Sequence, residues 1–252
     1  MADSTKTCTL EVFRYHPEQD SEPSLQKYEV PFSEDWVVLD ALNHIKGEMD
    51  GGVTYRWSCR MGVCGSCGMM VNGTPRLACS TFLKEFYPSP IRIEPLGGFP
   101  VIRDLVVNLD DFLEKLTRVQ AWLIPKENHP EVNGALKQTP AELADYKQFS
   151  MCINCMLCYA ACPVYAQEPH FLGPAAITLA HRYNLDSRDG ARAARLDVIS
   201  SDPGVWECAV IEECSAVCPK GVDPASAIQQ VKLEGATDWW RGMLIPKEKR
   251  GG

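Results

Sequence analysis

Eleven of the twelve cysteines fall into three closely spaced groups, which makes them the residues of this sequence best suited to chemistry. The groups are Cys59, Cys64, Cys67 and Cys79; Cys152, Cys155, Cys158 and Cys162; and Cys208, Cys214 and Cys218. Thiolates favour zinc, copper(I) and iron–sulfur clusters, so the spacing within each group must decide among these metals. The remaining cysteine, Cys8, stands alone among apolar neighbours, and we expect it to be a small buried hydrophobic side chain.

The first group has the spacing of plant-type [2Fe–2S] proteins. Its first three cysteines form a C-x4-C-x2-C pattern, and the fourth follows after eleven further residues. The small residues of the loop are Gly62, Gly65, Ser66 and Gly68. Small residues let a backbone curl around a cluster and direct its N–H groups at the sulfurs. A structural zinc site, the alternative, usually shows two separated C-x2-C pairs. The spacing therefore predicts a [2Fe–2S] cluster bound by Cys59, Cys64, Cys67 and Cys79.

The second and third groups repeat one pattern with a single position changed. Residues 152–163 read CINCMLCYAACP, which is the C-x2-C-x2-C-x3-C-P run of bacterial ferredoxins. Residues 208–219 read CAVIEECSAVCP. When the two runs are superposed, Ile211 stands where the second cysteine is expected, and the other cysteines match.

In two-cluster ferredoxins the fourth cysteine of a run binds the other cluster. The predicted ligands of a [4Fe–4S] cluster are therefore Cys152, Cys155, Cys158 and Cys218. The cysteines left for the second cluster are Cys162, Cys208 and Cys214. Because Ile211 offers no thiolate, the simplest result is a [3Fe–4S] cluster. A labile four-iron cluster with a non-protein fourth ligand is the alternative, and the apolar Ile211 disfavours it.

The composition excludes several functional classes. The chain has 252 residues, 45% of them hydrophobic, and a formal net charge of −8, which argues against nucleic-acid binding. The N-terminus lacks the features of a secretory signal, so we expect a reducing compartment, where clustered thiols bind metal. No apolar run approaches 18 residues, so we expect no membrane-spanning helix. No catalytic constellation stands out, and we predict no catalytic residue on this chain.

Residues 1–105 predict a small α+β unit. Stretches rich in β-forming residues at 8–15, 25–32 and 91–96 predict strands. Apolar residues at helical spacing predict a helix over 37–49. Asn72-Gly73 lies between two apolar runs, which is typical of a β-hairpin. The combination indicates a β-grasp-like domain that would carry the [2Fe–2S] cluster.

Residues 106–252 are predicted to be mostly α-helical. The helical stretches are 105–123, 139–149, 173–186 and 223–244. Thr139 is placed as the N-cap of the second, with Pro140 at its first position. The polar stretch 125–140 contains proline and glycine and predicts a surface connection. The expected fold class is thus α+β: a β-grasp plant-type ferredoxin domain over 1–105 and a mostly helical, bacterial-type two-cluster ferredoxin domain over 106–252.

With these ligands placed, nearly the whole chain resembles the iron–sulfur subunit of the succinate dehydrogenase and fumarate reductase family of succinate:quinone oxidoreductases. The resemblance rests on RWSCRMGVCGSCGMMVNG, RDLVVNLDDF, QFSMCINCMLCYAACPVY, GPAAITLAHRYNLDSRD and CSAVCPKGVDPASAIQQVK. It implies an electron-transfer subunit of a membrane-bound complex that serves the tricarboxylic acid cycle or anaerobic respiration. The dicarboxylate active site would lie on another chain.

The resemblance also implies partners and a location. The implied partners are a flavoprotein subunit that holds FAD, one or more membrane anchor subunits with or without heme b, and a quinone. The implied location is the cytoplasmic face of the bacterial inner membrane, where anchor subunits would hold the chain as a peripheral protein. Within the family, electrons pass in the order flavin, Cys59 group, four-iron cluster, three-iron cluster, quinone.

This order places the residues around the three-iron cluster next to the quinone. The residues expected there are Pro163, Val164, Tyr165, Ala209, Val210, Ile211 and Lys232. Most are apolar, which suits a dry quinone pocket. Lys232 is the exception, and its ammonium could donate a hydrogen bond to a quinone carbonyl. The alternative for Lys232 is an ordinary solvated lysine, since most lysines are exposed.

The direction of the reaction is read from two places in the sequence. Ubiquinone-linked members of the family usually carry a tryptophan pair after the C-P and a histidine after the first cysteine of the last run. Here VYAQ follows Pro163, and Ala209 follows Cys208. The resemblance therefore favours a menaquinone-linked fumarate reductase, although some menaquinone enzymes oxidise succinate. Two other functions stay open: a free-standing multi-cluster ferredoxin-type carrier, and a subunit of another quinone-linked dehydrogenase.

Overall fold

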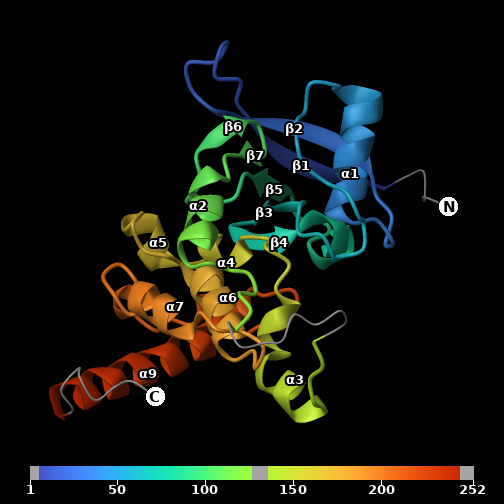
Figure 1. Cartoon of the computed structure of the whole chain (residues 1–252). Coiled ribbons are helices and arrows are strands. Elements are labelled where there is room, and N and C mark those ends of the chain that lie inside the picture. Colours follow the sequence, from blue (N-terminus) through green and yellow to red (C-terminus); the bar gives the residue numbers. More distant parts are fainter. Residues whose placement is uncertain (1–5, 127–135, 245–252) are drawn as a thin grey trace.

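The computed structural model describes residues 6–126 and 136–244, with side chains as far as residue 237. The strands gather in the N-terminal part of the chain and most of the helices in the C-terminal part, with the two parts packed together (Figure 1). This confirms the predicted α+β class. The predicted surface connection over 125–140 lies mostly outside the described residues.

Five strands form one mixed sheet in the order β2-β1-β5-β3-β4. Their bounds are β1 (Thr7–Arg14), β2 (Ser24–Pro31), β3 (Gly68–Val71), β4 (Thr74–Leu77) and β5 (Ile91–Glu94). β1 is antiparallel to β2 and parallel to β5, whereas β3 is antiparallel to both β4 and β5. A parallel β1–β5 pair requires a long crossover, and the whole first cysteine group lies within it. The sheet thus presents β3, β4 and this crossover at one edge.

Buried and less buried side chains alternate along β1, and the buried ones form part of the core of the sheet half. Cys8, Leu10 and Val12 are each at most 2% exposed, so the expected burial of Cys8 is confirmed. The predicted helix over 37–49 is present as α1 (Val38–His44), which continues into a π-helical turn, η1 (Ile45–Met49). The buried side chains of α1 join the same core as those of β1.

The predicted hairpin is confirmed between β3 and β4. Asn72 and Gly73 both have positive φ values, 47° and 79°, as a two-residue type I′ turn requires. The turn fixes the register of β3 and β4. Because Cys67 directly precedes β3 and Cys79 closely follows β4, the hairpin also brings these two cysteines to the same end of the sheet.

The rest of the described chain contains a two-stranded sheet and a set of mostly short helices. The two strands are β6 (Val101–Arg103) and β7 (Val106–Val107). The α-helices are α2 (Asp110–Arg118), α3 (Pro140–Tyr146), α4 (Leu157–Ala160), α5 (Pro163–Gln167), α6 (Pro174–Asn184), α7 (Arg192–Ile199), α8 (Glu213–Ala216) and α9 (Pro224–Leu244). Single 3-10 turns are η2 (Ala78–Ser80), η3 (Leu83–Glu85), η4 (Phe149–Met151) and η5 (Val205–Glu207).

The prediction of one helix over 105–123 was wrong at both ends. The first residues form β7, which pairs with β6, and α2 starts only where the Asn108 side-chain oxygen accepts the Asp110 N–H at 2.7 Å. α2 ends before Gln120, which has a φ of 50°. Buried Arg195 then holds the following segment, because its guanidinium donates to the carbonyls of Gln120 and Trp122. Tertiary hydrogen bonds thus replace the helical turn that the sequence predicted after Arg118.

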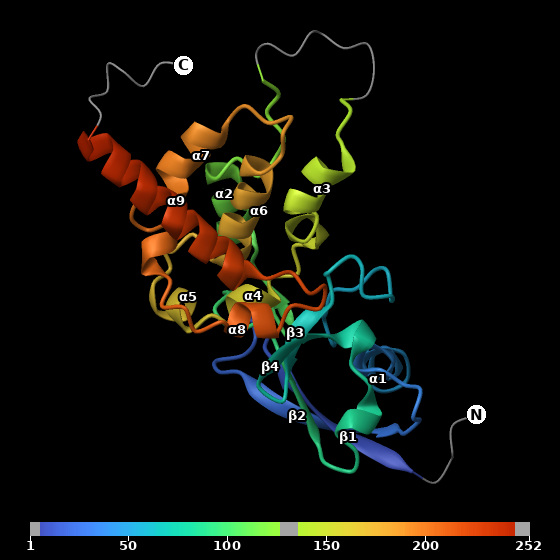
Figure 2. The same cartoon turned by 90° about the horizontal axis from the view of Figure 1, so that it is seen from below.

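The two long helices α6 and α9 pack side by side and carry the cysteine runs on their N-terminal sides. α9 also contacts α7, and the short helices α4 and α8 lie between α9 and the sheet (Figure 2). α6 is buried over most of its length, from Pro174 to Asn184. Thr139 caps α3 as predicted, since its side chain accepts the Glu142 N–H.

The two halves share one continuous core. It extends from Leu10 in β1 to Val231 in α9. At the junction, the Phe99 ring centroid lies 5.6 Å from that of Tyr165, and the Tyr159 and Tyr165 rings meet edge to face at 4.8 Å. Aromatic packing of this kind fixes the position of the helical half against the sheet half.

Candidate iron–sulfur cluster sites

The first cysteine group lies in a loop whose backbone N–H groups point at sulfur. The Cys59 Sγ accepts N–H groups from Val63 at 3.4 Å and Cys64 at 3.3 Å. The Gly62 N–H reaches the Cys79 Sγ at 3.3 Å. Gly62 has a φ of 66°, a value that favours glycine and allows the loop to reverse. The loop is therefore built to stabilise negative charge on two of the predicted ligands.

The pKa values of two of these thiols shift in opposite directions. N–H donors from Met61, Val63 and Cys64 lower the pKa of Cys59 to about 6. Burial raises the pKa of Cys67 to about 12, and the neighbouring thiols of Cys79 and Cys64 add to the rise. Metal binding requires thiolates, so binding of iron to Cys67 would release its proton.

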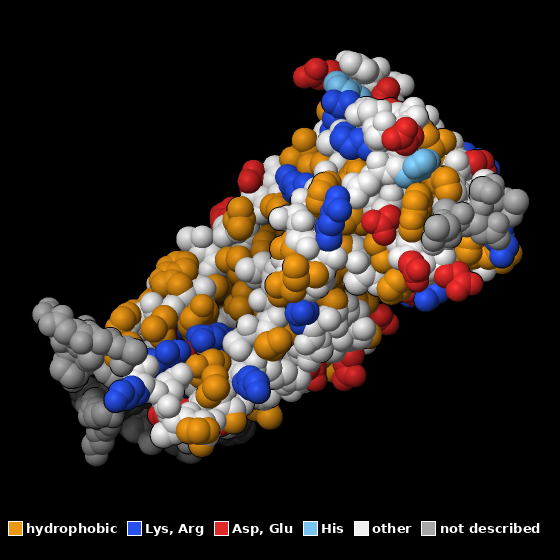
Figure 3. Space-filling view, turned by 90° about the vertical axis from the view of Figure 1, so that its right-hand side faces the viewer, with side chains coloured by type: hydrophobic (Ala, Val, Ile, Leu, Met, Phe, Trp, Pro, Cys, Tyr) orange, Lys and Arg blue, Asp and Glu red, His pale blue; other side chains and the backbone are white. Residues whose placement is uncertain are grey.

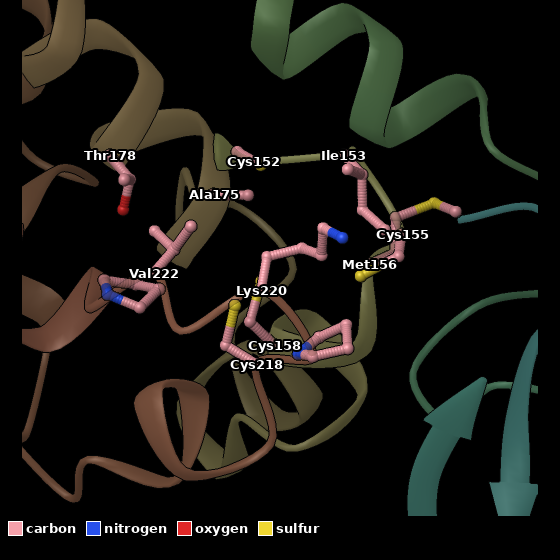
Figure 4. A pocket seen from close by; sticks show the side chains of 12 residues that line it. Cys152, Ile153, Cys155, Met156, Cys158, Ala175, Thr178, Cys218, Lys220 and Val222 are labelled. Carbon is pink, nitrogen blue, oxygen red and sulfur yellow. The ribbon is translucent and has the colours of Figure 1, made fainter. Parts of the chain in front are cut away.

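The second site is a cavity that takes cysteines from both later runs. Its lining includes Cys152, Cys155, Cys158 and Cys218, together with Lys220 (Figure 4). Cys162, although it belongs to the first run, is not among the lining residues. The grouping is the one predicted for the [4Fe–4S] ligands.

The cysteines of the second site are more buried than those of the first site. Burial raises the pKa of Cys158 well above its ordinary value, and Cys155, Cys152, Cys214 and Cys218 raise it further. Burial and neighbouring thiols also raise the pKa values of Cys152 and Cys155. Sulfurs held this close favour a shared cationic group, because they would otherwise repel once deprotonated.

The third site is a separate cavity around the remaining cysteines. Cys162, Cys208 and Cys214 line it, and Ile211 lines it at the position of the absent cysteine. Burial raises the pKa of Cys214 to about 11, with contributions from Cys162 and Cys208. The Ile211 side chain is 52% exposed, so this corner of the cavity borders the surface of the chain.

The two runs repeat an unusual backbone conformation as well as a sequence pattern. The second and fourth residues after each first cysteine have positive φ: Asn154 (52°) and Met156 (61°), then Val210 (58°) and Glu212 (68°). A β-branched residue such as Val210 rarely adopts positive φ, and such strain clusters at functional sites. Alternating right- and left-handed residues turn successive N–H groups toward one centre, which suits an anionic cluster. Short helices, α4 and α8, then follow in both runs.

A single metal ion does not account for these sites. In the described ranges, no three side chains among His, Cys, Asp and Glu converge on one possible ion position. A cluster needs no such convergence, because its thiolates are spread over several iron atoms: two thiolates on each iron in [2Fe–2S], and one on each in the larger clusters. The donor set of each site, composed of thiols, fits iron–sulfur clusters.

The structure places five of the seven residues predicted to face the quinone around the third cavity, and the other two outside its lining. Those that line the third cavity are Pro163, Val164, Ala209, Val210 and Ile211. Tyr165 is elsewhere: it is 5% exposed, and its hydroxyl donates to Asp111 at 2.7 Å. Lys232 is half-buried, and its Nζ donates to the Cys208 carbonyl at 2.8 Å. Lys232 is thus tied to the backbone of the third site rather than freely solvated.

Three features of the sites lay outside the sequence prediction. Lys220 enters the second cavity, and Asn154 and Met156 take left-handed conformations beside it. Gly65 allows the two halves to meet, because a Cβ there would lie 2.9 Å from the Cys155 Cβ. The position of Lys220, two residues after Cys218, was the available signal, but sequence proximity alone does not reveal the direction of a side chain.

Comparison with known proteins identifies both halves. A model of a 2Fe-2S iron-sulfur cluster binding domain matches residues 9–114, and a model of a 4Fe-4S dicluster domain matches residues 148–222. Among solved structures, a chain of the Mycobacterium smegmatis Sdh1 complex in the apo form is similar at a TM-score of 0.84, with 25% sequence identity. The similarity covers 94% of this chain and 98% of that one.

Similar sequences extend over nearly the full length. The fumarate reductase iron-sulfur subunit of Mycobacterium tuberculosis (strain CDC 1551 / Oshkosh) is 57% identical over 237 residues, 94% of this chain and 96% of the relative. That of Haemophilus influenzae (strain ATCC 51907 / DSM 11121 / KW20 / Rd) is 53% identical, at 94% and 96% coverage. The succinate dehydrogenase iron-sulfur subunit of Coxiella burnetii (strain RSA 493 / Nine Mile phase I) is 36% identical, at 90% and 96% coverage.

Exchange of one cysteine between the runs can be tested by substitution. We expect Cys218→Ser to damage the [4Fe–4S] signal first, because Cys218 lines the second cavity although Cys214 lines the third. Electron paramagnetic resonance (EPR) of the reduced and oxidised protein measures each cluster separately. Cys8→Ser is the control, and it should leave every cluster in place. Selective loss of the three-iron signal in Cys218→Ser would mean that each run binds its own cluster, without exchanging a cysteine with the other run.

Proposed function

Since the chain belongs to the iron–sulfur subunits of the fumarate reductase and succinate dehydrogenase family, we propose that it carries electrons between a flavoprotein subunit that holds FAD and a quinone at a membrane anchor. The observation that carries this proposal is the separation of eleven cysteines into three sites, with most of these cysteines packed in or against one continuous core. The dicarboxylate chemistry belongs to another subunit of the complex.

The proposed ligand sets follow the three sites. Cys59, Cys64, Cys67 and Cys79 would hold [2Fe–2S]; Cys152, Cys155, Cys158 and Cys218 would hold [4Fe–4S]; and Cys162, Cys208 and Cys214 would hold [3Fe–4S]. When bound, such clusters supply one-electron transfer at potentials set by cluster type, charge and hydrogen bonds to sulfur. The chain itself supplies thiolates, directs N–H groups at those of the first site, and buries Cys155 and Cys158 of the second site. We also propose that the division near residue 105 separates the first site from the other two.

The surface around the third site supports docking on a membrane anchor. Val210 and Ile211, which line this site, are 42% and 52% exposed, and Trp206, two residues before Cys208, is 48% exposed. Exposed hydrophobic groups of this size mark interaction surfaces. Elsewhere, the face shown in Figure 3 also carries hydrophobic patches along the helical half of the molecule. We propose that six residues border the quinone: Pro163, Val164, Ala209, Val210, Ile211 and Lys232. Tyr165, which is buried in α5, would hold this helix in place through its hydrogen bond to Asp111.

No helix in the described part of the chain is long and apolar enough to cross a membrane. We propose that the chain is held at the cytoplasmic face of the bacterial inner membrane by its anchor subunits. The higher identity to fumarate reductase subunits, 57% and 53%, than to a succinate dehydrogenase subunit, 36%, supports fumarate reduction with menaquinol as the physiological direction.

The purified native complex provides the direct test of this function. We expect the chain to co-purify with a flavoprotein and membrane proteins, and to support faster fumarate reduction with a menaquinol analogue than succinate oxidation with a ubiquinone analogue. A chain that purifies alone would instead indicate a free-standing carrier. Faster ubiquinone-linked succinate oxidation would reverse the proposed direction.

The identity of residue 211 should determine the type of the third cluster. We expect Ile211→Cys to supply the missing thiolate, so that a fourth iron binds, the three-iron EPR signal disappears and the potential of this centre falls. Val210→Cys is the matched control, because it places a thiol one residue away from the ligand position. If the wild-type protein has no three-iron signal when oxidised, the [3Fe–4S] proposal is wrong.

Lys232 offers a test at the quinone end. We expect Lys232→Leu to lower quinone-linked turnover, because the variant removes the ammonium beside Cys208 and with it a donor for a quinone carbonyl. Reduction of the clusters by an artificial donor should stay unchanged, and Lys232→Arg should retain much of the turnover. Wild-type kinetics of the leucine variant with the native quinone would remove Lys232 from the quinone site.

A further inference from the structure

Lys220 reaches from the helical half into the loop of the first cysteine group. Its Nζ donates a hydrogen bond to the carbonyl oxygen of Gly62 at 3.2 Å, across 158 positions of sequence. Its side chain is half-buried and lines the second cavity beside the sulfurs of the later cysteine runs (Figure 4). One cation therefore belongs to two cluster sites at once.

The carbonyl that Lys220 binds is linked directly to a ligand sulfur. The Gly62 carbonyl and the Val63 N–H belong to the same peptide group, and this N–H donates to the Cys59 Sγ at 3.4 Å. A hydrogen bond from an ammonium polarises the peptide and makes its N–H a stronger donor, as in other hydrogen-bond chains. The charge of Lys220 thus acts on Cys59 through a single peptide group.

The charge of Lys220 is not cancelled nearby. Among the ion pairs of the described residues, none involves Lys220. The first loop also lies in close contact with the run that starts at Cys152, because a Cβ on Gly65 would lie 2.8 Å from the Ile153 carbonyl oxygen. An uncompensated cation at a tight junction acts with little screening on both sides.

We propose that Lys220 is a positioning residue for electron transfer between the first and second sites, and that its charge raises the reduction potentials of both. Reduction adds one electron to a cluster and makes its net charge more negative, so a fixed cation stabilises the reduced form. The hydrogen bond to Gly62 also keeps the first loop against the second cavity. This inference rests on the proposed ligand sets.

The test is an EPR redox titration of the cluster-loaded complex that carries Lys220→Met. The reduction potential of the four-iron cluster should fall, with the ratio of reduced to oxidised cluster about tenfold lower at a fixed solution potential; this corresponds to about 59 mV for one electron. The [2Fe–2S] potential should fall in the same direction by a smaller amount. Lys220→Arg keeps the charge and should restore most of both potentials.

A matched control removes the same charge at a distance. Lys27 lies on β2, at the opposite edge of the sheet from β4, and its side chain is 72% exposed. Lys27→Met should leave both potentials at their wild-type values, which separates a local effect of Lys220 from a change in net charge.

The outcomes distinguish this inference from the proposed function. Unchanged potentials in Lys220→Met, with all clusters present, would overturn the role of Lys220 while leaving the ligand sets intact. Absence of the clusters from the wild-type complex would instead overturn the ligand sets themselves. If Lys220→Met fails to retain clusters, the neutral Lys220→Gln is compared with Lys220→Arg, and equal potentials in these two variants would overturn the proposal.

Discussion

The exchange of one cysteine between two consecutive runs is the constraint on which the helical half depends. The second cavity takes Cys218 from the later run, and the third takes Cys162 from the earlier one. Neither set of sulfurs can assemble unless the two runs face each other. The packing of α6 against α9 and of α4 against α8 provides this arrangement, and it explains why α6 is buried over most of its length.

The backbone of each run shows how strongly the sites shape the chain. Val210 and Met156 adopt left-handed conformations that their side chains disfavour, and the equivalent position of the other run, Asn154 and Glu212 respectively, is left-handed as well. Because the same turns recur with different side chains, the common cause is the direction of the N–H groups rather than local propensity. The strain is supported by the continuous core beneath both runs.

The cysteines gather around the cavities in the groups that the sequence suggested. The spacing of the cysteines is a local property of the chain, and the repeated run indicates that the last cysteine of each run joins the other group. The sequence predicted β-strands, the Asn72-Gly73 turn and the capped start of α3 for the same reason. It failed where tertiary contacts decide. The helix expected over 105–123 was shortened by strand pairing and by Arg195, which donates to carbonyls more than seventy residues away. The positions of Tyr165 and Lys220 also depend on the packing of the two halves, which no local pattern encodes.

The central claim is that one chain holds three clusters of different size, and iron analysis combined with EPR tests it most directly. For the purified wild-type chain in its complex, with FAD and any heme accounted for separately, the account predicts about nine non-heme irons, the sum of two, four and three. The oxidised sample should show a three-iron signal that accounts for one cluster per chain. About ten irons with no three-iron signal would contradict the assignment of the third site. About six would mean that the third site holds no cluster, and about five that the second site holds none.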